Sequence, residues 1–314
     1  MNELLPISVI MSVYKEPTEW LRQTIDSILS QTFKDFEFIV ISDYPAGADN
    51  NALLKDYAQM DNRIKLIFNE ENIGLTKSLN KGLAVAKGKY IARMDADDIS
   101  LPERFEKQYA YMECHPNVIV LGTAIKYIGK GAWKKATDGI RFADEEIRAQ
   151  MFIDNCIAHP TVFIRKAVLD TYGLKYDETY KHSQDFRLWE QMWDYGEFAN
   201  LKDKLLMYRL SDQQITKSSK SSQANLSDSV KIRLQKRWLD GFGYNYSIDT
   251  IQNAPFDIIK VLRNNNQVNG TAQFSAFVQN AYLYAPCKDK RQMLFKQKDY
   301  RFLPLMNLVR LLIK

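Results

Sequence analysis

Three carboxylates follow one apolar, β-prone segment of the chain. The segment covers residues 89–94, and Asp95, Asp97 and Asp98 come next, with only Ala96 between the first two. This pattern predicts a buried strand that delivers carboxylates at its carboxyl end, the edge where open α/β sheets bind ligands. Crowded acids repel one another unless a cation lies among them. Because Mg²⁺ and Mn²⁺ prefer oxygen ligands, often with substrate phosphates, one interpretation is a metal–diphosphate site.

The alternative interpretation is an acidic turn that caps the following helix. Asp98 or Ser100 would then be the N-cap of a helix that begins within 101–104. Both interpretations can hold together, because capping by Asp98 or Ser100 leaves Asp95 and Asp97 available for binding. An isolated Asp-x-Asp pair is a weak signal, so the neighbouring elements have to decide.

The first 121 residues alternate between strand and helix patterns. Strands are predicted at 7–14, 36–43, 64–68, the segment from Tyr90 and 118–121, and helices at 18–31, 50–59, 75–87 and 102–114. This alternation predicts βαβ units, and therefore a single, mostly parallel Rossmann-like sheet flanked by helices. Parallel strands end at one edge of a sheet. We therefore expect Tyr14, Asp43, Asn72 and residues 95–98 to gather there.

The pattern is less regular after residue 121. We expect a short helix at 145–152, an extended segment at 159–164 because Pro160 disfavours helix at His159, a helix from Gln184 and a last short strand at 205–209. A polar Ser/Lys linker is predicted at 218–222. The expected organisation is a catalytic domain at 1–217 and a helical extension at 225–314.

Composition restricts the class of protein. With 314 residues, 46% of them hydrophobic and 26% charged, the chain suits a soluble protein with one large domain or one domain and an extension. No apolar run approaches the roughly 20 residues that span a bilayer, and no signal peptide is expected. Three dispersed cysteines, Cys114, Cys156 and Cys287, fit inert thiols in a reducing cytoplasm. The charge of +5 suits anionic phosphates or a membrane surface, and no nucleic-acid-binding signature accompanies it.

Five segments occur in an order that is specific as a set. They are Ser-Val-Ile-Met-Ser-Val-Tyr at 8–14, Ile-Val-Ile-Ser-Asp at 39–43, Asn-Ile-Gly-Leu-Thr-Lys-Ser-Leu-Asn at 72–80, Tyr-Ile-Ala-Arg-Met-Asp-Ala-Asp-Asp at 90–98 and Gln-Asp-Phe-Arg-Leu-Trp at 184–189. Over roughly its first two-thirds, the chain resembles the family 2 glycosyltransferases of GT-A fold, above all bacterial enzymes that build surface polysaccharides. The resemblance implies an inverting, metal-dependent transfer, with Mn²⁺ or Mg²⁺, from a nucleotide-diphosphate sugar. A UDP-sugar donor and a glycan or lipid-linked saccharide acceptor, in O-antigen, capsule or similar biosynthesis, are expected.

The resemblance also implies a donor site. Its residues would be Ser12, Val13, Tyr14, Glu16, Asp43, Asn72, Gly74, Lys77, Asp95, Ala96 and Asp97. Asp95 would hold the ribose hydroxyls and Asp97 the metal, while Asp43 would accept a hydrogen bond from uracil N3–H. Asp43 could instead be a turn-forming Asp that bonds nearby backbone. Lys77, where the family often has Arg, could equally be a surface lysine.

On the acceptor side, the resemblance assigns the catalytic base to Asp185, which would take the proton of the acceptor hydroxyl. The alternative for Asp185 is a first-turn acid that stabilises the helix dipole. Gln184 stands where the family usually has Glu, and it lies with His159 on the possible acceptor side. A hydrogen-bonded structural role for His159 is an equal alternative. Leu210 replaces a His that some members use as a metal ligand, so the metal would rely on Asp97, diphosphate and water.

The last third of the chain carries no assignable motif. It mixes apolar residues with Lys and Arg near 231–238 and 295–314. Such helices can bind an anionic membrane, or they can pack on a domain and expose a basic face. The expected location is the cytoplasm, with a peripheral position on the cytoplasmic face of the inner membrane as an open alternative.

Three other functions compete with an active transferase. A catalytically silent sugar-nucleotide-binding assembly partner would share the fold, but the presence of Asp95, Asp97 and Asp185 argues against it. A dinucleotide-dependent oxidoreductase would need Gly-x-Gly-x-x-Gly after the first strand, which is absent there. A phosphatase with an Asp-x-Asp nucleophile would carry that motif on its first strand, and here it follows the fourth.

Overall fold

The computed structural model describes residues 5–132, 140–151, 154–211 and 220–241. They fall into two compact units, one within Met1–Thr137 and Ile157–Leu226 and the other within Asp138–Cys156 and Ser227–Lys314. The predicted division into 1–217 and 225–314 stays a prediction, because most of the expected extension lies outside the described residues. In the part that is described, no helix combines the length and the apolar character needed to cross a membrane.

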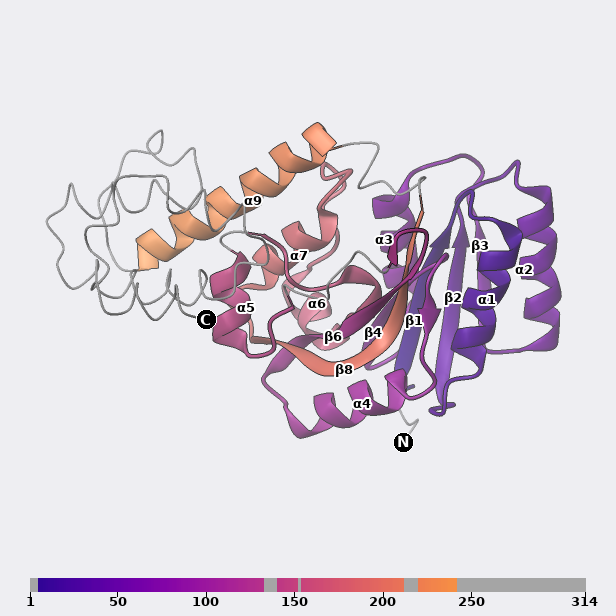
Figure 1. The fold of residues 1–314 in the computed structure, drawn as a ribbon, viewed down its shortest axis with the longest axis horizontal. Helices are drawn as coiled ribbons and strands as arrows, with labels where there is room; N and C mark the ends of the chain where they lie inside the picture. Colours follow the sequence, from indigo (N-terminus) through magenta and orange to yellow (C-terminus); the bar gives the residue numbers. More distant parts are fainter. Residues whose placement is uncertain (1–4, 133–139, 152–153, 212–219, 242–314) are drawn as a thin grey trace, which may run out of the picture. The chain divides into compact units, whose positions relative to one another are not determined.

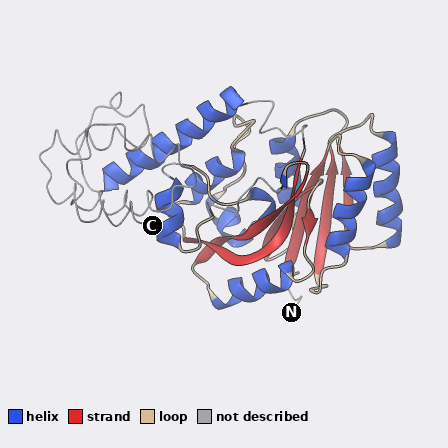
Figure 2. Cartoon of the chain, viewed as in Figure 1, coloured by secondary structure: helices blue, strands red, loops and turns tan. Residues whose placement is uncertain are grey.

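The first unit is built on one sheet of eight strands, drawn in red in Figure 2. The strands are β1 (Ile7–Val13), β2 (Phe36–Ser42), β3 (Ile64–Phe68), β4 (Tyr90–Asp95), β5 (Ile99–Ser100), β6 (Val118–Gly129), β7 (Phe163–Arg165) and β8 (Glu197–Leu210). Their order is β3-β2-β1-β4-β7-β6-β8-β5. The first four strands in this order are mutually parallel, as are β6 and β8, whereas β7 and β5 run antiparallel to their neighbours. The predicted α/β class with a mostly parallel sheet is confirmed.

Helices cover both faces of the parallel part of the sheet. Those of the first unit are α1 (Thr18–Leu29), α2 (Ala48–Met60), α3 (Leu75–Val85), α4 (Arg104–Cys114), α6 (Lys166–Tyr172) and α7 (Gln184–Met192). Figure 1 shows α1 and α2 on one side of β1–β3 and α3 on the other. The approach of α3 is close, because a Cβ at Gly82 would lie 2.6 Å from Ile10 Cγ2 and 3.0 Å from Ile41 Cδ1. The two remaining described helices are α5 (Asp144–Met151) and α9 (Lys220–Gly241).

Register places the polar ends of the parallel strands at one edge. Val13 of β1 is level with Ser42 of β2, and Ser12 is level with Asp95 of β4. The loops that begin at Tyr14, Asp43 and Ala96 therefore start from neighbouring strand ends. The predicted gathering of polar residues at the carboxyl edge is confirmed.

Several local predictions were wrong. Strands β6 and β8 are far longer than the segments 118–121 and 205–209, because they pair with each other along most of their length. Neither α6 nor β5 was predicted. Residues His159–Thr161 form a single 3-10 turn rather than an extended segment, since the fixed φ of proline also fits the first turn of a helix. The expected linker at 218–222 overlaps α9, which begins at Lys220.

The predicted cap of α4 was also wrong. The N-cap residue is Glu103, and no side chain caps this end. Asp98 and Ser100 instead make tertiary bonds: Asp98 Oδ1 accepts from Arg209 N at 2.8 Å, and Ser100 Oγ accepts from Gln31 Nε2 at 3.1 Å.

Helix α3 fixes the loop that leads to α7. Asn80 Nδ2 donates to Tyr176 O at 2.9 Å and to Glu178 at 3.1 Å, while Asn80 Oδ1 accepts from Tyr176 N at 3.0 Å. One turn earlier on α3, Thr76 Oγ1 donates to Tyr180 O at 3.0 Å. Residues four apart lie on one face of a helix, so α3 presents a polar face that holds residues 176–180.

Replacing Asn80 by alanine should loosen this loop. The variant loses an acceptor and two donors, and each lost hydrogen bond of this kind costs about 1 kcal/mol. A loss of 1–2 kcal/mol corresponds to amide exchange about 5–30 times faster in residues 176–180, measured by hydrogen–deuterium exchange. Lys77→Ala changes an exposed residue of the same helix and should leave these rates unchanged. Equal rates in Asn80→Ala and the native chain would contradict the docking role.

Candidate active site

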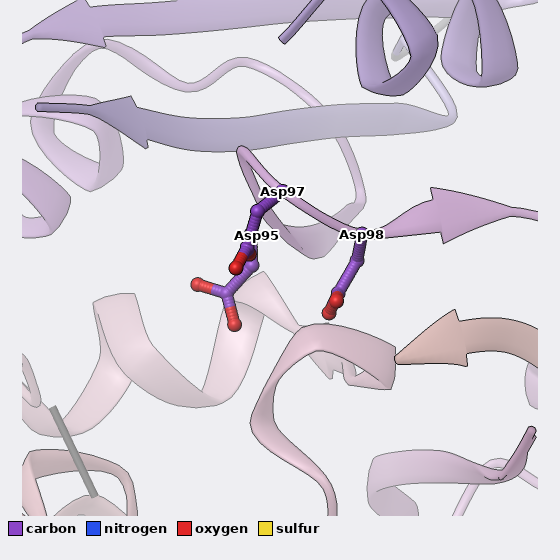
Figure 3. Close-up of side chains that lie close together, drawn as sticks. All are labelled: Asp95, Asp97 and Asp98. Carbon is purple, nitrogen blue, oxygen red and sulfur yellow. The ribbon is translucent and has the colours of Figure 1, made fainter. Parts of the chain in front are cut away.

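An acidic cluster lies at the carboxyl end of β4. Asp95, Asp97 and Asp98 each offer a carboxylate oxygen, and these atoms all lie within 4.8 Å of one another. Figure 3 shows the three side chains pointing to the same side of the segment that carries them. Asp98 is 1% exposed, and its Oδ2 atom is buried without a hydrogen-bond partner. The structure thus brings together the acids that the sequence placed in a metal–diphosphate site.

Crowding changes the protonation of this cluster. Burial, followed by the charges of Asp95 and Glu16, raises the pKa of Asp97 to about 7. Burial and the charges of Asp95 and Asp97 also raise the pKa of Asp98 well above its ordinary value. A cation among these oxygens would offset the repulsion, and a set of carboxylate oxygens is the donor set that Mg²⁺ and Mn²⁺ prefer. The residues therefore fit a divalent ion.

The edge of the sheet braces the turn that carries these acids. Strand β5 follows the acids directly, and Ile99 pairs with Met207 of β8. From the same strand, Arg209 Nε donates to Asp97 O at 2.7 Å and Arg209 N to Asp98 Oδ1. The Arg209 guanidinium also lies 4.9 Å from the ring centroid of Trp20 and bonds Gln23. Sequence reasoning missed Arg209, because residues separated by more than 100 positions show no spacing pattern.

The loop after β1 presents an aromatic pair. The rings of Tyr14 and Tyr44 meet edge to face, with centroids 5.4 Å apart, and the Lys15 ammonium lies 4.9 Å and 5.2 Å from them. Glu16 Oε2 accepts from Tyr14 N at 2.7 Å. Burial raises the pKa of Glu16, and the charge of Asp95 adds to the effect. Tyr14 and Glu16 therefore lie at the same edge as the acids, next to the half-buried Ser12 and the buried Val13.

Asp43 holds the turn that opens α3. Its Oδ1 atom accepts from Asn69 Nδ2 at 2.8 Å and from Ile73 N at 2.9 Å, and its Oδ2 atom accepts from Gly74 N at 2.8 Å. Gly74 has φ of +85°, a conformation that glycine adopts without steric cost. Asp43 thus bonds backbone thirty residues away rather than its own turn, and its role in binding the base stays a prediction.

The remaining predicted donor residues lie near this turn or in the acidic turn. Asn72 and Lys77 are exposed, and Lys77 makes no hydrogen bond or ion pair within the described part of the chain. Ala96 is 2% exposed, and its carbonyl accepts from Thr24 Oγ1 of α1 at 3.0 Å. Ala96 therefore contributes backbone to the turn that orients Asp95 and Asp97.

Asp185 lies in the first turn of α7, which begins at Gln184. The preceding residue, Ser183, has φ of +56°, a left-handed conformation that is uncommon for residues other than glycine and clusters at functional sites. Gln184 is buried. Arg187 of α7 pairs with Asp177 at 3.2 Å, so the helix is tied to the loop that α3 holds.

His159 and Tyr176 connect the two sides of the site. His159 is 8% exposed, and its Nε2 atom lies 2.8 Å from the Tyr176 hydroxyl. Burial and the charge of Arg93 lower the pKa of His159 well below its ordinary value. Burial raises the pKa of Tyr176, and the charges of Asp185 and Asp95 raise it further. Tyr176 therefore lies within electrostatic reach of both acids. His159 is therefore a neutral, hydrogen-bonded side chain inside the site.

Two further residues near the acids were missed by sequence reasoning. Burial and the charges of the three clustered acids raise the pKa of Tyr208 of β8. Arg93 of β4 is buried and pairs with Asp95. A spacing of two residues on a strand puts both side chains on one face, so Arg93 could have been found from its position, whereas Tyr208 could not.

The chain is similar to known proteins in sequence and in fold. The profile of the family described as "Glycosyl transferase family 2" matches residues 8–173. An uncharacterized glycosyltransferase of Methanocaldococcus jannaschii is 38% identical over 207 residues, which are 65% of this chain and 70% of that protein. The O-antigen biosynthesis glycosyltransferase WbnJ of Escherichia coli is 34% identical over 246 residues, which are 75% and 92% of the two chains. The amylovoran biosynthesis glycosyltransferase AmsE of Erwinia amylovora is 33% identical over 215 residues, or 67% and 78%.

Among solved structures, residues 1–349 of Staphylococcus aureus TarS in complex with UDP-GlcNAc superpose with a TM-score of 0.59. The two sequences are 18% identical, and the match covers 88% of this chain and 80% of that one, so it bears on the fold alone. The expected GT-A fold is confirmed. The sequence matches show that the chain belongs to glycosyl transferase family 2.

Proposed function

We propose that this glycosyltransferase carries out an inverting transfer from a nucleotide-diphosphate sugar, with UDP favoured, to a saccharide acceptor of a surface polysaccharide. The observation that carries the proposal is the acidic cluster at the edge where four parallel strands end, with Asp185 near its other side. The relatives that serve O-antigen and amylovoran biosynthesis support the class of acceptor. TarS was crystallised with UDP and with UDP-GlcNAc, which supports a uridine donor.

The nucleoside would lie over the ends of β1 and β2. Tyr14 is 38% exposed and offers a ring face to a base, since aromatic rings stack readily on nucleobases. A carboxylate oxygen has two lone pairs, and Asp43 Oδ2 uses one of them for Gly74 N. The other would accept uracil N3–H. Asp95 would hold the ribose hydroxyls.

Asp97 would hold the divalent ion, together with the donor diphosphate and water, and Asp98 Oδ2 is a further oxygen within reach. When bound, the ion would neutralise charge on the leaving diphosphate. Asp185 would take the proton of the acceptor hydroxyl on the opposite face of the sugar, as a single displacement with inversion requires. Neutral His159 and Tyr176 would exclude water between these two sides.

A catalytically silent sugar-nucleotide-binding partner is the alternative, and no observation favours it. The acids proposed for donor binding lie together at the end of β4, and the acid proposed for proton transfer lies in the first turn of α7. Two other acids lie on the loop that leads to α7, and both have partners there. Asp177 accepts from Thr179 Oγ1 at 2.6 Å and pairs with Arg187, and Glu178 bonds Asn80. Asp185 is assigned as the base on the family motif at 184–189 and on its place in the first turn of α7.

The native protein should bind UDP more tightly than GDP or ADP, and only with Mn²⁺ or Mg²⁺ present. The preference follows from the acceptor that Asp43 offers to N3–H, and the ion dependence follows from the repulsion among the clustered acids. Calorimetry would measure both, and release of UDP from UDP-sugars would separate an enzyme from a silent binder. Asp97→Ala should remove the ion dependence while leaving the melting temperature without ligand near its native value. Equal affinity for UDP and GDP, or equal UDP affinity in chelator, would contradict this assignment.

Asp185→Asn should lower kcat by about 10²–10⁴-fold, the usual contribution of a positioned base. The amide keeps the shape of the side chain but cannot take the proton. Affinity for the donor should hardly change, because the lost interaction forms only in the transition state. Steady-state kinetics and UDP binding would both be measured, with Asp177→Asn, on the loop that leads to α7, as the matched control. Near-native turnover with saturating acceptor would assign the base to another residue.

We also propose that the extension at 225–314 holds the enzyme at the cytoplasmic face of a membrane, where a lipid-linked acceptor would be met. The support is the mixture of apolar and basic residues near 231–238 and 295–314. Sedimentation with anionic liposomes should capture the full chain. Binding should weaken as salt rises, since each Lys or Arg near the surface adds about 1 kcal/mol of screened attraction. Binding that is equal on neutral liposomes, or absent at low salt, would count against this location.

A further inference from the structure

Arg93 is a buried cation whose hydrogen-bonding capacity is only partly used. Its Nη2 atom donates to Asp95 Oδ1, whereas Nε and Nη1 are buried and have no hydrogen-bond partner among the residues that the structure describes. The Arg93 side chain is 4% exposed, but that of Asp95 is 31% exposed. The positive charge is therefore fixed inside the protein, and the carboxylate that it holds faces the site.

The groups that act on this guanidinium include the carboxylate of Asp98 and the neutral side chains of Tyr176 and His159. His159 is uncharged, because burial and Arg93 lower its pKa, and its ring bonds the Tyr176 hydroxyl. On the opposite side of β4, Arg104 Nη2 donates to the carbonyl of Arg93 at 2.8 Å, which fixes the backbone of the strand. Asp95 is thus the anion that forms an ion pair with Arg93.

Stability alone does not account for this arrangement. A buried ion pair offsets its desolvation only with good geometry and with its remaining donors satisfied, and here two guanidinium nitrogens are unsatisfied. The arrangement makes sense in the site, because guanidinium stays charged at every physiological pH. A fixed positive charge beside three crowded carboxylates offsets part of their repulsion before any cation or diphosphate arrives.

We propose that Arg93 is a positioning residue that acts through Asp95: it is a built-in counter-charge that holds this carboxylate aimed at the nucleoside. The proposal rests on the proposed function, in which Asp95 holds the ribose hydroxyls. It predicts opposite effects on two ligands. Without Arg93, UDP should bind less tightly because Asp95 is no longer held, whereas Mn²⁺ alone should bind at least as tightly because a nearby positive charge has gone.

The experiment is a double-mutant cycle on the full chain. Arg93→Met, Asp95→Asn and the double variant are compared with the native protein, with UDP affinity measured by calorimetry and Mn²⁺ affinity by electron paramagnetic resonance of the unbound ion. Arg93→Met should weaken UDP about 10-fold, within the range for contacting residues. In the Asp95→Asn background the same change should have almost no further effect. The double variant leaves neither charge of this pair without its partner, so it can be compared with Asp95→Asn even if Arg93→Met folds poorly. Arg93→Lys should restore part of the UDP affinity.

Arg165→Gln is the matched control. Arg165 Nη1 donates to the hydroxyl of Tyr90, and Arg165 Nε to Val118 O, at the far end of β4 from the acids. This variant should lower the melting temperature without changing UDP affinity and Mn²⁺ affinity in opposite directions. Additive effects in the cycle, or equal weakening of UDP and Mn²⁺ by Arg93→Met, would overturn the role of Arg93. Failure of the native protein to bind UDP would instead overturn the proposed function, and the assignment of Asp95 with it.

Discussion

Repulsion among carboxylates at the end of β4 is the constraint on which the rest of the site depends. Asp95, Asp97 and Asp98 lie within 4.8 Å of one another, and two of them are pushed toward the protonated form by burial and by each other. Such a cluster costs free energy, which a positive charge nearby can offset. The surrounding elements hold the acidic turn in place, because β5 pairs with β8 and Arg209 bonds the backbone of the turn. Arg93 supplies a buried positive charge.

Helix α3 joins the two functional sides. Its amino end is set by Asp43, which bonds the amides of Ile73 and Gly74, while Thr76 and Asn80 hold the loop that leads to α7. The turn expected near the donor and the helix that carries Asp185 are therefore attached to the same rigid element. Packing through Gly82 places α3 directly on β1 and β2, so the turn that Asp43 holds and the loop that leads to α7 are coupled through one helix.

Local patterns in the sequence were sufficient for the parallel half of the fold. Apolar runs of strand length alternate with amphipathic helices up to residue 121. Each predicted element there is found within a few residues of its expected bounds, except that β6 continues to Gly129. The gathering of Tyr14, Asp43 and the acids at one edge follows from parallel topology alone. The ordered motifs were also sufficient to identify the family, because residues that contact a shared ligand recur in a fixed order along the chain.

Only the tertiary structure decided what pairs at long range. The lengths of β6 and β8 depend on each other, since their backbone groups are satisfied by mutual pairing rather than by any local propensity. Asp43 turned out to bond amides thirty residues away. Asp98 bonds β8, and Ser100 bonds Gln31 just after α1, so neither caps α4. The sequence by itself determined which side chains could do chemistry and on which edge they lie. The partners that orient those side chains come from distant segments, so only the folded chain fixes them.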